Sequence, residues 1–447
     1  MPTLSRMRRK DQVMSAVPFI DQFAGVYQAA AAGLPGARTP AVAARRTAAL
    51  EAFCRLGLPN HKLESWKFTG LNALERQSWS PPANEGGVDA ARLKAATLDA
   101  DSHRLVFVNG RFDAAASRIG TLPRGVTLLP LSAANTALSD VLAAAGTDRA
   151  VSLSELNAAL ASDGVVLLLD DGVVLEQPVE ILVFGVPALV NLRHLIRLGR
   201  NARATVLESY RDGGIAAPGW TNVFAHVAVG EGARLSHIRL QGENASAYHA
   251  ALGQVSIGTG ARYAHASVQA GAALARHELH VTFAGGAAEA DIQGLVLARG
   301  KAHLDHTLFL HHAVPECRSN QLFKHVVDDA GHAVFQGGIR VAPHAQKTDA
   351  QQLSRTLLLA DRAQIDTKPE LEILADDVKC SHGASIGDVD AQQMFYMQAR
   401  GIPAAEARRL LLSGFAYEVV SAVPEGALRD HVEAFVEVWL AEKGAAA

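Results

Sequence analysis

The sequence predicts a mainly β fold in which a parallel β-helix lies between two helical ends. Three observations lead to this prediction. From about residue 163 to residue 388 the chain consists of short extended segments separated by turns. Long apolar helices are missing between these segments, which argues against alternating β–α units. Alanines precede the extended segments at recurring intervals, and such self-similarity is typical of a solenoid.

The repeat sets the expected size of one coil. Its spacings are 31, 28, 27, 14, 31 and 30 residues, between Ala202, Ala233, Ala261, Ala288, Ala302, Ala333 and Ala363. The interval of 14 is half of the others, as expected if each coil has two similar halves. The first strands are expected at Val165–Leu169 and, after a turn at 170–172, at Val173–Leu175. The β-helix is therefore assigned to residues 161–389.

Residues 1–160 are expected to form a mainly helical N-terminal domain. The stretch Ala43–Leu56 ends at Gly57 and Pro59, and a second helical stretch covers 131–161. The apolar face expected for the first stretch consists of Leu50, Phe53, Cys54 and Leu56. Between the two stretches, Leu105–Val108 and its Asn109–Gly110 turn predict a short strand.

Residues 390–447 are expected to form a C-terminal helical domain. Asp390 is a helix cap, and the helix that follows it ends at Gly401. Pro403 begins a second helix, in which Ala407, Leu410, Leu411, Gly414 and Phe415 share one face. A last helix carries an apolar stripe of Leu428, Val432, Phe435, Val436 and Trp439. These stripes either pack on each other and on the solenoid or dock a partner protein.

Composition excludes several classes of protein. The 447 residues carry a net charge of −3, which suggests neither a nucleic-acid nor a membrane partner. The apolar run at 13–20 is too short to cross a membrane, so a cytoplasmic location is expected. The three cysteines, Cys54, Cys317 and Cys380, exclude a disulfide framework and a Cys-rich zinc site. They also cannot supply the four ligands of an iron–sulfur cluster at one place.

Cys380 and His382 form the most informative pair in the chain. They follow an extended apolar segment, and side chains two residues apart on a strand point to the same side. A thiolate beside an imidazole suits iron, copper or zinc. Two ligands do not close a metal site, so the missing ligands are expected from elsewhere.

The segment around this pair, Asp376–Ala384, resembles the signature of the SufB/SufD family, in its SufD form. This family provides subunits of the SUF iron–sulfur cluster assembly machine. Other segments resemble family motifs in the same order along the chain; these are Glu64–Thr69, Leu105–Gly110, Ala345–Ala350, Phe395–Tyr396 and Arg400–Ile402. The resemblance runs from about residue 60 to the C-terminus.

The resemblance implies a right-handed β-helix between helical ends and a scaffold that is not an enzyme. The implied partners are a SufB-type subunit, joined through the β-helices, and a SufC-type ATPase on the C-terminal helices. His382, with Cys380 as a second candidate, is implied as a ligand of a transient iron–sulfur cluster at the subunit interface. The isolated chain would hold no stable cluster, and a homodimer is an alternative for it.

Other candidate groups are interpreted as structural. His277 and His280 are three apart in a strand-like setting, so they would point to opposite faces and not form a zinc-protease site. In the patch of His303, His306, His311 and His312, strand parity places His303 with Asp305 and turns His306 away. The segment Gly294–Lys301 has the wrong spacing for a phosphate loop.

The alternative from another class is a β-helix carbohydrate-active enzyme, with Glu370 and Glu372 or a histidine as catalytic groups. A solvated strand face is the simpler interpretation of the two glutamates. A third alternative is an interaction module without any ligand role. Within the family, the SufB type of subunit is the alternative that is hardest to distinguish from the SufD type. The Glu64–Thr69 motif and the scarcity of cysteine argue against the SufB type.

Overall fold

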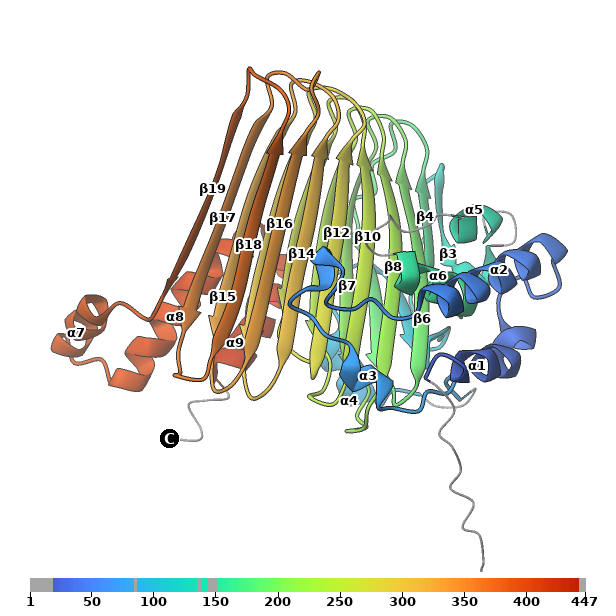
Figure 1. The fold of residues 1–447 in the computed structure, drawn as a ribbon, viewed down its shortest axis with the longest axis horizontal. Helices are drawn as coiled ribbons and strands as arrows, with labels where there is room; N and C mark the ends of the chain where they lie inside the picture. Colours follow the sequence, from blue (N-terminus) through green and yellow to red (C-terminus); the bar gives the residue numbers. More distant parts are fainter. Residues whose placement is uncertain (1–18, 84–86, 135–137, 144–150, 442–447) are drawn as a thin grey trace, which may run out of the picture.

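The computed structural model describes residues 19–83, 87–134, 138–143 and 151–441. It confirms the predicted fold class: two long sheets, coiled into a solenoid, lie between N-terminal and C-terminal helices (Figure 1). From β4 to β19 successive strands alternate between the two sheets, so that neighbouring strands in each sheet are two apart in sequence order and parallel. The apolar run at 13–20 lies mostly outside the described residues.

Sheet A has ten strands, with β19 at one end and β1–β2 at the other. They are β1 (His103–Val108), β2 (Arg111–Phe112), β5 (Val179–Gly185), β7 (Arg203–Asp212), β9 (Arg234–Gly242), β11 (Arg262–Gln269), β13 (Glu289–Ala298), β15 (Arg318–Val327), β17 (Asp349–Leu358) and β19 (Lys379–Gly387). The predicted strand at Leu105–Val108 lies in β1, which pairs in parallel with β5 and so extends the solenoid into the N-terminal region.

Sheet B has nine strands and ends at β18 and β3. They are β3 (Val126–Pro130), β4 (Val165–Leu169), β6 (Leu189–Leu198), β8 (Trp220–Val229), β10 (Tyr248–Ile257), β12 (Leu274–Phe283), β14 (His303–His312), β16 (His332–Val341) and β18 (Gln364–Ile373). The strand predicted at Val165–Leu169 is β4. The strand predicted at Val173–Leu175 is wrong: this segment forms no strand, and Val174 makes one isolated β-bridge, to Arg203.

The alanine repeat follows the coil with one exception. Ala202, Ala233, Ala261 and Ala288 directly precede β7, β9, β11 and β13, whose first residues pair in register. Ala302 and Ala363 directly precede β14 and β18, so the interval of 14 residues marks the step from sheet A to sheet B. Ala333 is out of phase, because it lies inside β16 and Gly331 occupies the equivalent corner.

The helices lie outside the coil, and those other than α7 cover its two outer faces. They are α1 (Gln22–Ala30), η1 (Ala31–Gly33), α2 (Pro40–Leu56), η2 (Glu64–Trp66), α3 (Asn72–Glu75), α4 (Ala90–Ala96), η3 (Leu131–Ala133), α5 (Leu138–Ala143), α6 (Val151–Leu160), α7 (Ala391–Ala399), α8 (Ala404–Val420) and α9 (Ala427–Ala441). Phe23, Phe53 and Trp79 pack on Trp220 and Tyr248 of sheet B. Helices α8 and α9 pack on sheet A, where they bury its outward leucines and valines. The helices therefore bury apolar faces that the coil alone leaves exposed.

Two predicted helix faces differ from the structure. Leu56 is 51% exposed because it lies at the end of α2, beyond its packed face. In α8 the buried face contains Ala407, Leu412, Ala416, Val419 and Val420, whereas Leu410 is 39% exposed. Because α8 carries apolar residues on more than one side, its contact with the outer surface of sheet A determines which side is buried. The stripe of α9 is confirmed, with Phe435 only partly buried.

The segment Glu64–Thr69 lies across the outer face of sheet B, and we call it the 64–69 strap. Arg276 of β12 donates a hydrogen bond of 2.8 Å to the carbonyl oxygen of Ser65, and its guanidinium lies 4.0 Å from the ring centre of Trp66. Gln336 of β16 donates to the same carbonyl oxygen at 3.0 Å. Glu64 forms an ion pair with Lys368 of β18. Together with the contacts of Thr69 to β14, the strap thus connects four strands of sheet B, out to its last strand.

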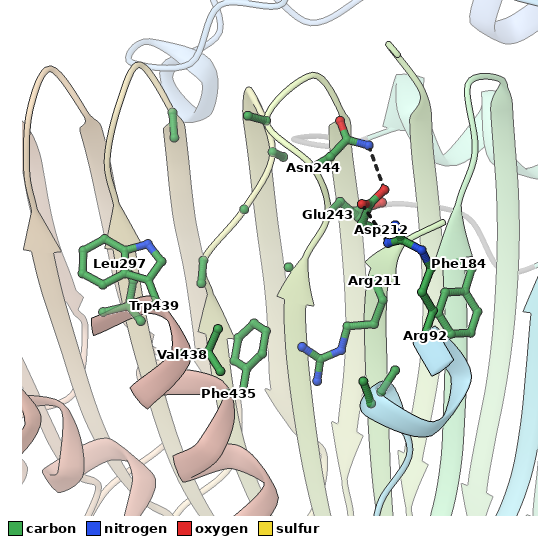
Figure 2. A pocket seen from close by; sticks show the side chains of 18 of the residues that line it. Arg92, Phe184, Arg211, Asp212, Glu243, Asn244, Leu297, Phe435, Val438 and Trp439 are labelled. Carbon is green, nitrogen blue, oxygen red and sulfur yellow. Dashed lines mark hydrogen bonds and ion pairs between the residues drawn. The ribbon is translucent and has the colours of Figure 1, made fainter. Parts of the chain in front are cut away.

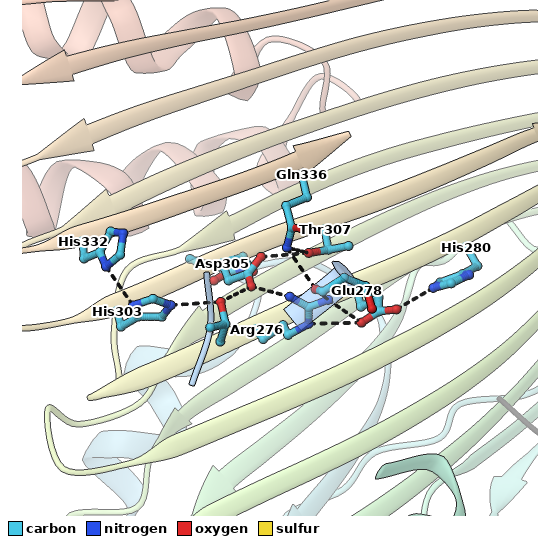
Figure 3. Close-up of polar contacts among 11 residues, drawn as sticks. Arg276, Glu278, His280, His303, Asp305, Thr307, His332 and Gln336 are labelled. Carbon is cyan, nitrogen blue, oxygen red and sulfur yellow. Dashed lines mark hydrogen bonds and ion pairs between the residues drawn. The ribbon is translucent and has the colours of Figure 1, made fainter. Parts of the chain in front are cut away.

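A buried polar network anchors the strap (Figure 3). Arg276 pairs with Asp305 and, at 2.7 Å, with Glu278, which also contacts His280 at 2.6 Å. Thr69 bonds to Asp305 and, at 3.0 Å, to Nε2 of His303. Burial alone would raise the pKa of Glu278, but the charge of Arg276 and the hydrogen bond from His280 hold it at about 2. The network therefore keeps an ionised carboxylate inside the protein, which requires this dense pairing.

Candidate functional site

The two ends of the solenoid differ. At the N-terminal end, sheet A finishes in the antiparallel pair β1–β2 and sheet B in the antiparallel pair β3–β4. At the other end β19 pairs only with β17, and β18 only with β16, within the described part of the chain. The outer edges of β18 and β19 therefore present backbone groups to a further strand.

Cys380 and His382 both lie on β19, the last strand of sheet A. Cys380 pairs in register with Ala350 and His382 with Gln352, whose side chains are buried inside the coil. The two predicted site residues thus share the inward side of the last strand, at the open end of the solenoid. Lys379 has the opposite parity, as expected for a continuous strand.

Two turns hold the beginning of β19 in place. In the first turn, Lys347 adopts a φ of 62° and forms an ion pair with Asp377 of the second. The backbone N–H of Lys347 donates to the carbonyl oxygen of Asp377 at 2.7 Å, and the Asp377 N–H donates to Oε1 of Gln346 at 2.9 Å. Lys379 N–H then donates to Thr348 O at 2.8 Å. Two motifs of the sequence, Ala345–Ala350 and Asp376–Ala384, are therefore one structural unit that sets the register of β19.

The thiol and the imidazole differ in accessibility. Cys380 is half-buried and packs beside Leu371 and Val378 against the apolar cluster at this end. Burial, together with the charge of Asp349, raises the pKa of its thiol. A neutral thiol is a poor ligand and nucleophile. His382 is exposed, so in the isolated chain the imidazole is the more available donor of the two.

The mouth around His382 is largely apolar. Ile365 and Leu371 of β18 pack toward the coil interior, and Ile386 of β19 is 53% exposed. Ile373 and Leu374 are also exposed at this end. Exposed isoleucine and leucine beside two free strand edges are typical of a surface that another protein covers.

A column of amide side chains lies directly beneath His382. In the register of sheet A, His382 of β19 pairs with Gln352 of β17, and Gln352 pairs in turn with Gln321 of β15. Gln352 donates from Nε2 to Oε1 of Gln321 at 2.7 Å. Both glutamines are buried, with exposures of 3% and 1%. No local pattern in the sequence singles out either residue, because only the strand register connects them to His382.

The other histidines lie as strand parity predicts. His277 points into the coil, where its ring lies 5.3 Å from His265 and 5.7 Å from His306, and His280 points outward to Glu278. His303 shares the outer face with Asp305, whereas His306 is inside. Burial lowers the pKa values of His265, His277 and His306 well below the usual value. These rings are neutral core groups.

A large cavity lies elsewhere, on the outer face of sheet A between α4 and α9 (Figure 2). Its volume is about 730 Å³, and Arg211, Asp212 and Phe435 line it. Asp212 forms an ion pair with Arg92 at 3.3 Å, and Glu243 pairs with His249 at 2.7 Å. Both carboxylates in its wall are thus engaged in the structure. The Glu370 and Glu372 pair of β18 forms outward ion pairs with Lys368 and Arg340.

Helix α7 is largely exposed: none of its residues is fully buried, and only Met394 and Met397 are partly buried. The side chain of Asp390 caps it by accepting hydrogen bonds from the N–H groups of Gln392 and Gln393, as predicted. Phe395 and Tyr396 are 72% and 61% exposed. Arg400 donates a hydrogen bond of 3.1 Å to the Tyr396 hydroxyl, which holds this ring in place. In Figure 1 this helix extends away from the solenoid.

Within the described residues, no group of three or more His, Cys, Asp or Glu side chains is arranged to hold a metal ion. None of the described helices is both long and apolar enough to span a bilayer. The candidate site predicted from the sequence lies at the open end of the solenoid, where His382 is exposed and Cys380 is half-buried.

Comparisons with known proteins agree on one family. Residues 185–415 match the SufBD core domain of the SUF system for iron–sulfur cluster assembly, and residues 19–181 match the SufBD N-terminal region. An iron–sulfur cluster assembly SufBD family protein of Synechocystis is 33% identical over 86% of this chain and 88% of its own length. The iron–sulfur cluster assembly protein SufD of Escherichia coli is 33% identical over 86% of this chain and 89% of its own. The chloroplastic protein ABCI7 of Arabidopsis thaliana is 38% identical over 49% of this chain and 46% of its own.

Proposed function

The chain belongs to the SufBD family of the SUF iron–sulfur cluster assembly system, and from this premise we propose that it is the SufD-type scaffold subunit. Its role is to supply one or two ligands and the geometry for a nascent cluster at a subunit interface. The cluster is the cargo of this scaffold. The cytoplasmic location expected from the sequence stays a prediction.

One observation carries the proposal: His382 is exposed on the inward side of the last strand of sheet A, with Cys380 two residues before it. A cluster needs about four ligands, most of them thiolates. Cys380 and His382 provide two at most, so the remaining ligands would come from a second chain placed against this end. Coordination of Fe²⁺ by the half-buried Cys380 would favour its thiolate form.

The partner at this end is proposed to be the SufB-type subunit. Two free strand edges, of β18 and β19, favour pairing with strands of another β-helix, because backbone hydrogen bonds would continue both sheets. The exposed Ile373, Leu374 and Ile386 would be buried in the same contact. A second copy of this chain could pair in the same way when the partner is absent, but it would add only one further Cys380 and one further His382, so this contact would hold two thiols in all.

The SufC-type ATPase is proposed to dock on α7. The apolar stripe of α9 is already buried against sheet A, so this helix has no free stripe to offer. Helix α7 instead exposes Phe395 and Tyr396 side by side, and exposed aromatic residues are common anchors of protein interfaces. Because α7 follows β19 after three residues, a force applied to α7 would reach the strand that carries His382.

The chain is proposed to have no catalytic activity of its own, in line with the scaffold role. The carbohydrate-active alternative would need a pair of free carboxylates in a cleft. Glu370 and Glu372 instead point outward from β18 and pair with Lys368 and Arg340. Their arrangement supports the interpretation as a solvated strand face.

Co-expression with SufB-type and SufC-type subunits tests this function. We expect the three chains to purify together and His382→Ala to keep the association while losing bound iron and sulfide. His344→Ala, which removes an exposed imidazole from the loop before β17, is the matched control. Purification of this chain alone, with activity on a glycan, would support the enzyme instead. Normal iron and sulfide in His382→Ala would support a module without a ligand role.

A further inference from the structure

The side-chain amide of Gln352 has an unused hydrogen-bonding atom. Its Nε2 donates to Oε1 of Gln321 at 2.7 Å, but its Oε1 has no hydrogen-bond partner among the described residues. The side chain is 3% exposed. A buried carbonyl oxygen without a partner is rare in folded proteins and calls for an explanation.

Register and amide geometry indicate what this oxygen faces. Gln321, Gln352 and His382 occupy one column on β15, β17 and β19. The oxygen and nitrogen of an amide point in different directions, so donation by Nε2 toward β15 turns Oε1 away from β15. The next side chain of the column on that side is His382. Stacked amide ladders in parallel sheets continue from strand to strand in this way.

The opposite wall of the coil leaves room for this amide. Gly337 of β16 faces Gln352, and a Cβ atom at Gly337 would lie 2.4 Å from Nε2 and 2.7 Å from Cδ of Gln352. The absence of a side chain at residue 337 therefore lets the amide lie in the interior. This close approach fixes the amide between Gly337 and Gln321, so it is held in one orientation before any partner arrives.

We propose that Gln352 is a positioning residue for His382: when a partner covers the open end, one ring N–H of His382 donates to Oε1 of Gln352. The second ring nitrogen then carries its lone pair toward the partner, ready to bind iron. In the isolated chain His382 is exposed. The inference rests on the proposed function, because it assigns the ring its role as a ligand. Metal-binding histidines commonly have their second nitrogen fixed in this way by an oxygen acceptor.

The tautomer of His382 tests the proposal. Only this chain is labelled with ¹⁵N-histidine, and ¹⁵N spectra are recorded for its complex with the SufB-type and SufC-type subunits. The His382 signal is identified by its loss in His382→Ala. Gln352→Met removes the acceptor, and Gln352→Glu keeps a carbonyl oxygen at the same place. Ser354→Ala, a buried change on the inward side of the same strand, is the matched control.

We expect a single His382 tautomer in the wild-type complex, in Gln352→Glu and in Ser354→Ala, and a mixture of tautomers in Gln352→Met. Iron retained by the Gln352→Met complex should fall on the order of 10-fold. If Gln352→Met does not fold, Gly337→Ala replaces it, because the added methyl group displaces the amide and should give the same mixture.

The outcomes separate this inference from the proposed function. An unchanged single tautomer in folded Gln352→Met overturns the inference and leaves the function intact. If the tautomer of His382 depends on Gln352 but His382→Ala retains normal iron, the contact between Gln352 and His382 is supported and the role of His382 as an iron ligand is overturned. Failure of the chains to associate overturns both.

Discussion

Replacement of Arg276 by methionine should destabilise the protein strongly and in a pH-dependent way. Arg276 is 1% exposed and interacts with Glu278, Asp305, the carbonyl oxygen of Ser65 and the ring of Trp66. Methionine fills most of the same volume but leaves the two carboxylates without their cation. Breaking a buried ion pair by removing one partner costs about 3–5 kcal/mol. We expect a loss of this size in the free energy of unfolding at pH 7.

The pH dependence follows from Glu278. In the wild type its pKa is lowered from 4.5 to about 2, so its stabilising contribution is present above pH 4.5 and is lost as the pH falls toward 2. In Arg276→Met, burial without the guanidinium raises the pKa of this carboxyl group, so protonation favours the folded variant as the pH falls. The difference in stability between the two proteins should therefore shrink from pH 7 to pH 4.

Urea unfolding followed by circular dichroism at pH 7, 5.5 and 4 measures this difference. Arg340→Met is the matched control, because Arg340 lies on the same outer face in an exposed pair with Glu372 at 3.5 Å. Such a pair contributes about 0–1 kcal/mol. A loss below about 1 kcal/mol for Arg276→Met at pH 7, where about 3–5 kcal/mol is expected, would refute the reasoning. So would a loss that stays constant from pH 7 to pH 4.

Two further predictions concern the proposed interfaces. Iodoacetamide should modify Cys380 more slowly in the folded isolated chain than in urea, because burial raises the pKa of its thiol. Binding of the SufB-type partner should slow the modification further. Mass spectrometry of the modified peptide measures these rates, and equal rates in the folded and the unfolded chain would contradict the placement of Cys380 as a half-buried thiol. Phe395→Asp should abolish co-purification of the SufC-type ATPase and leave the melting temperature unchanged, because no residue of α7 is buried. The control is Ile215→Asp, another exposed apolar residue, and retention of the ATPase by Phe395→Asp would argue against docking on α7.

Local signals predicted the elements of the coil well. β4 covers the predicted Val165–Leu169, and four of the alanines precede strands that pair in register. Small residues recur there because the corners between sheets leave little room for side chains. Ala333 departs from this rule because glycine fills the corner of its coil. Strand parity also placed Cys380 with His382 on one side and separated His277 from His280.

Long-range contacts could not be predicted from the sequence. The 64–69 strap reaches residues more than 200 positions away, such as Arg276 and Lys368, and no local pattern encodes those pairs. The buried face of α8 depends on the shape of sheet A, which decides between several apolar sides of the helix. Gln352 was missed for the same reason, because its relation to His382 appears only once the register of β17 and β19 is known.

The central claim is that His382 completes a coordination sphere shared with another chain. X-ray absorption at the iron edge of the purified complex tests it most directly, with the spectra of wild type, His382→Ala and His344→Ala each normalised to the iron that the complex retains. The claim predicts a nitrogen neighbour of iron in the wild type and in His344→Ala that is missing in His382→Ala. Identical iron environments in all three proteins would contradict it, as would a stable iron–sulfur cluster in this chain alone.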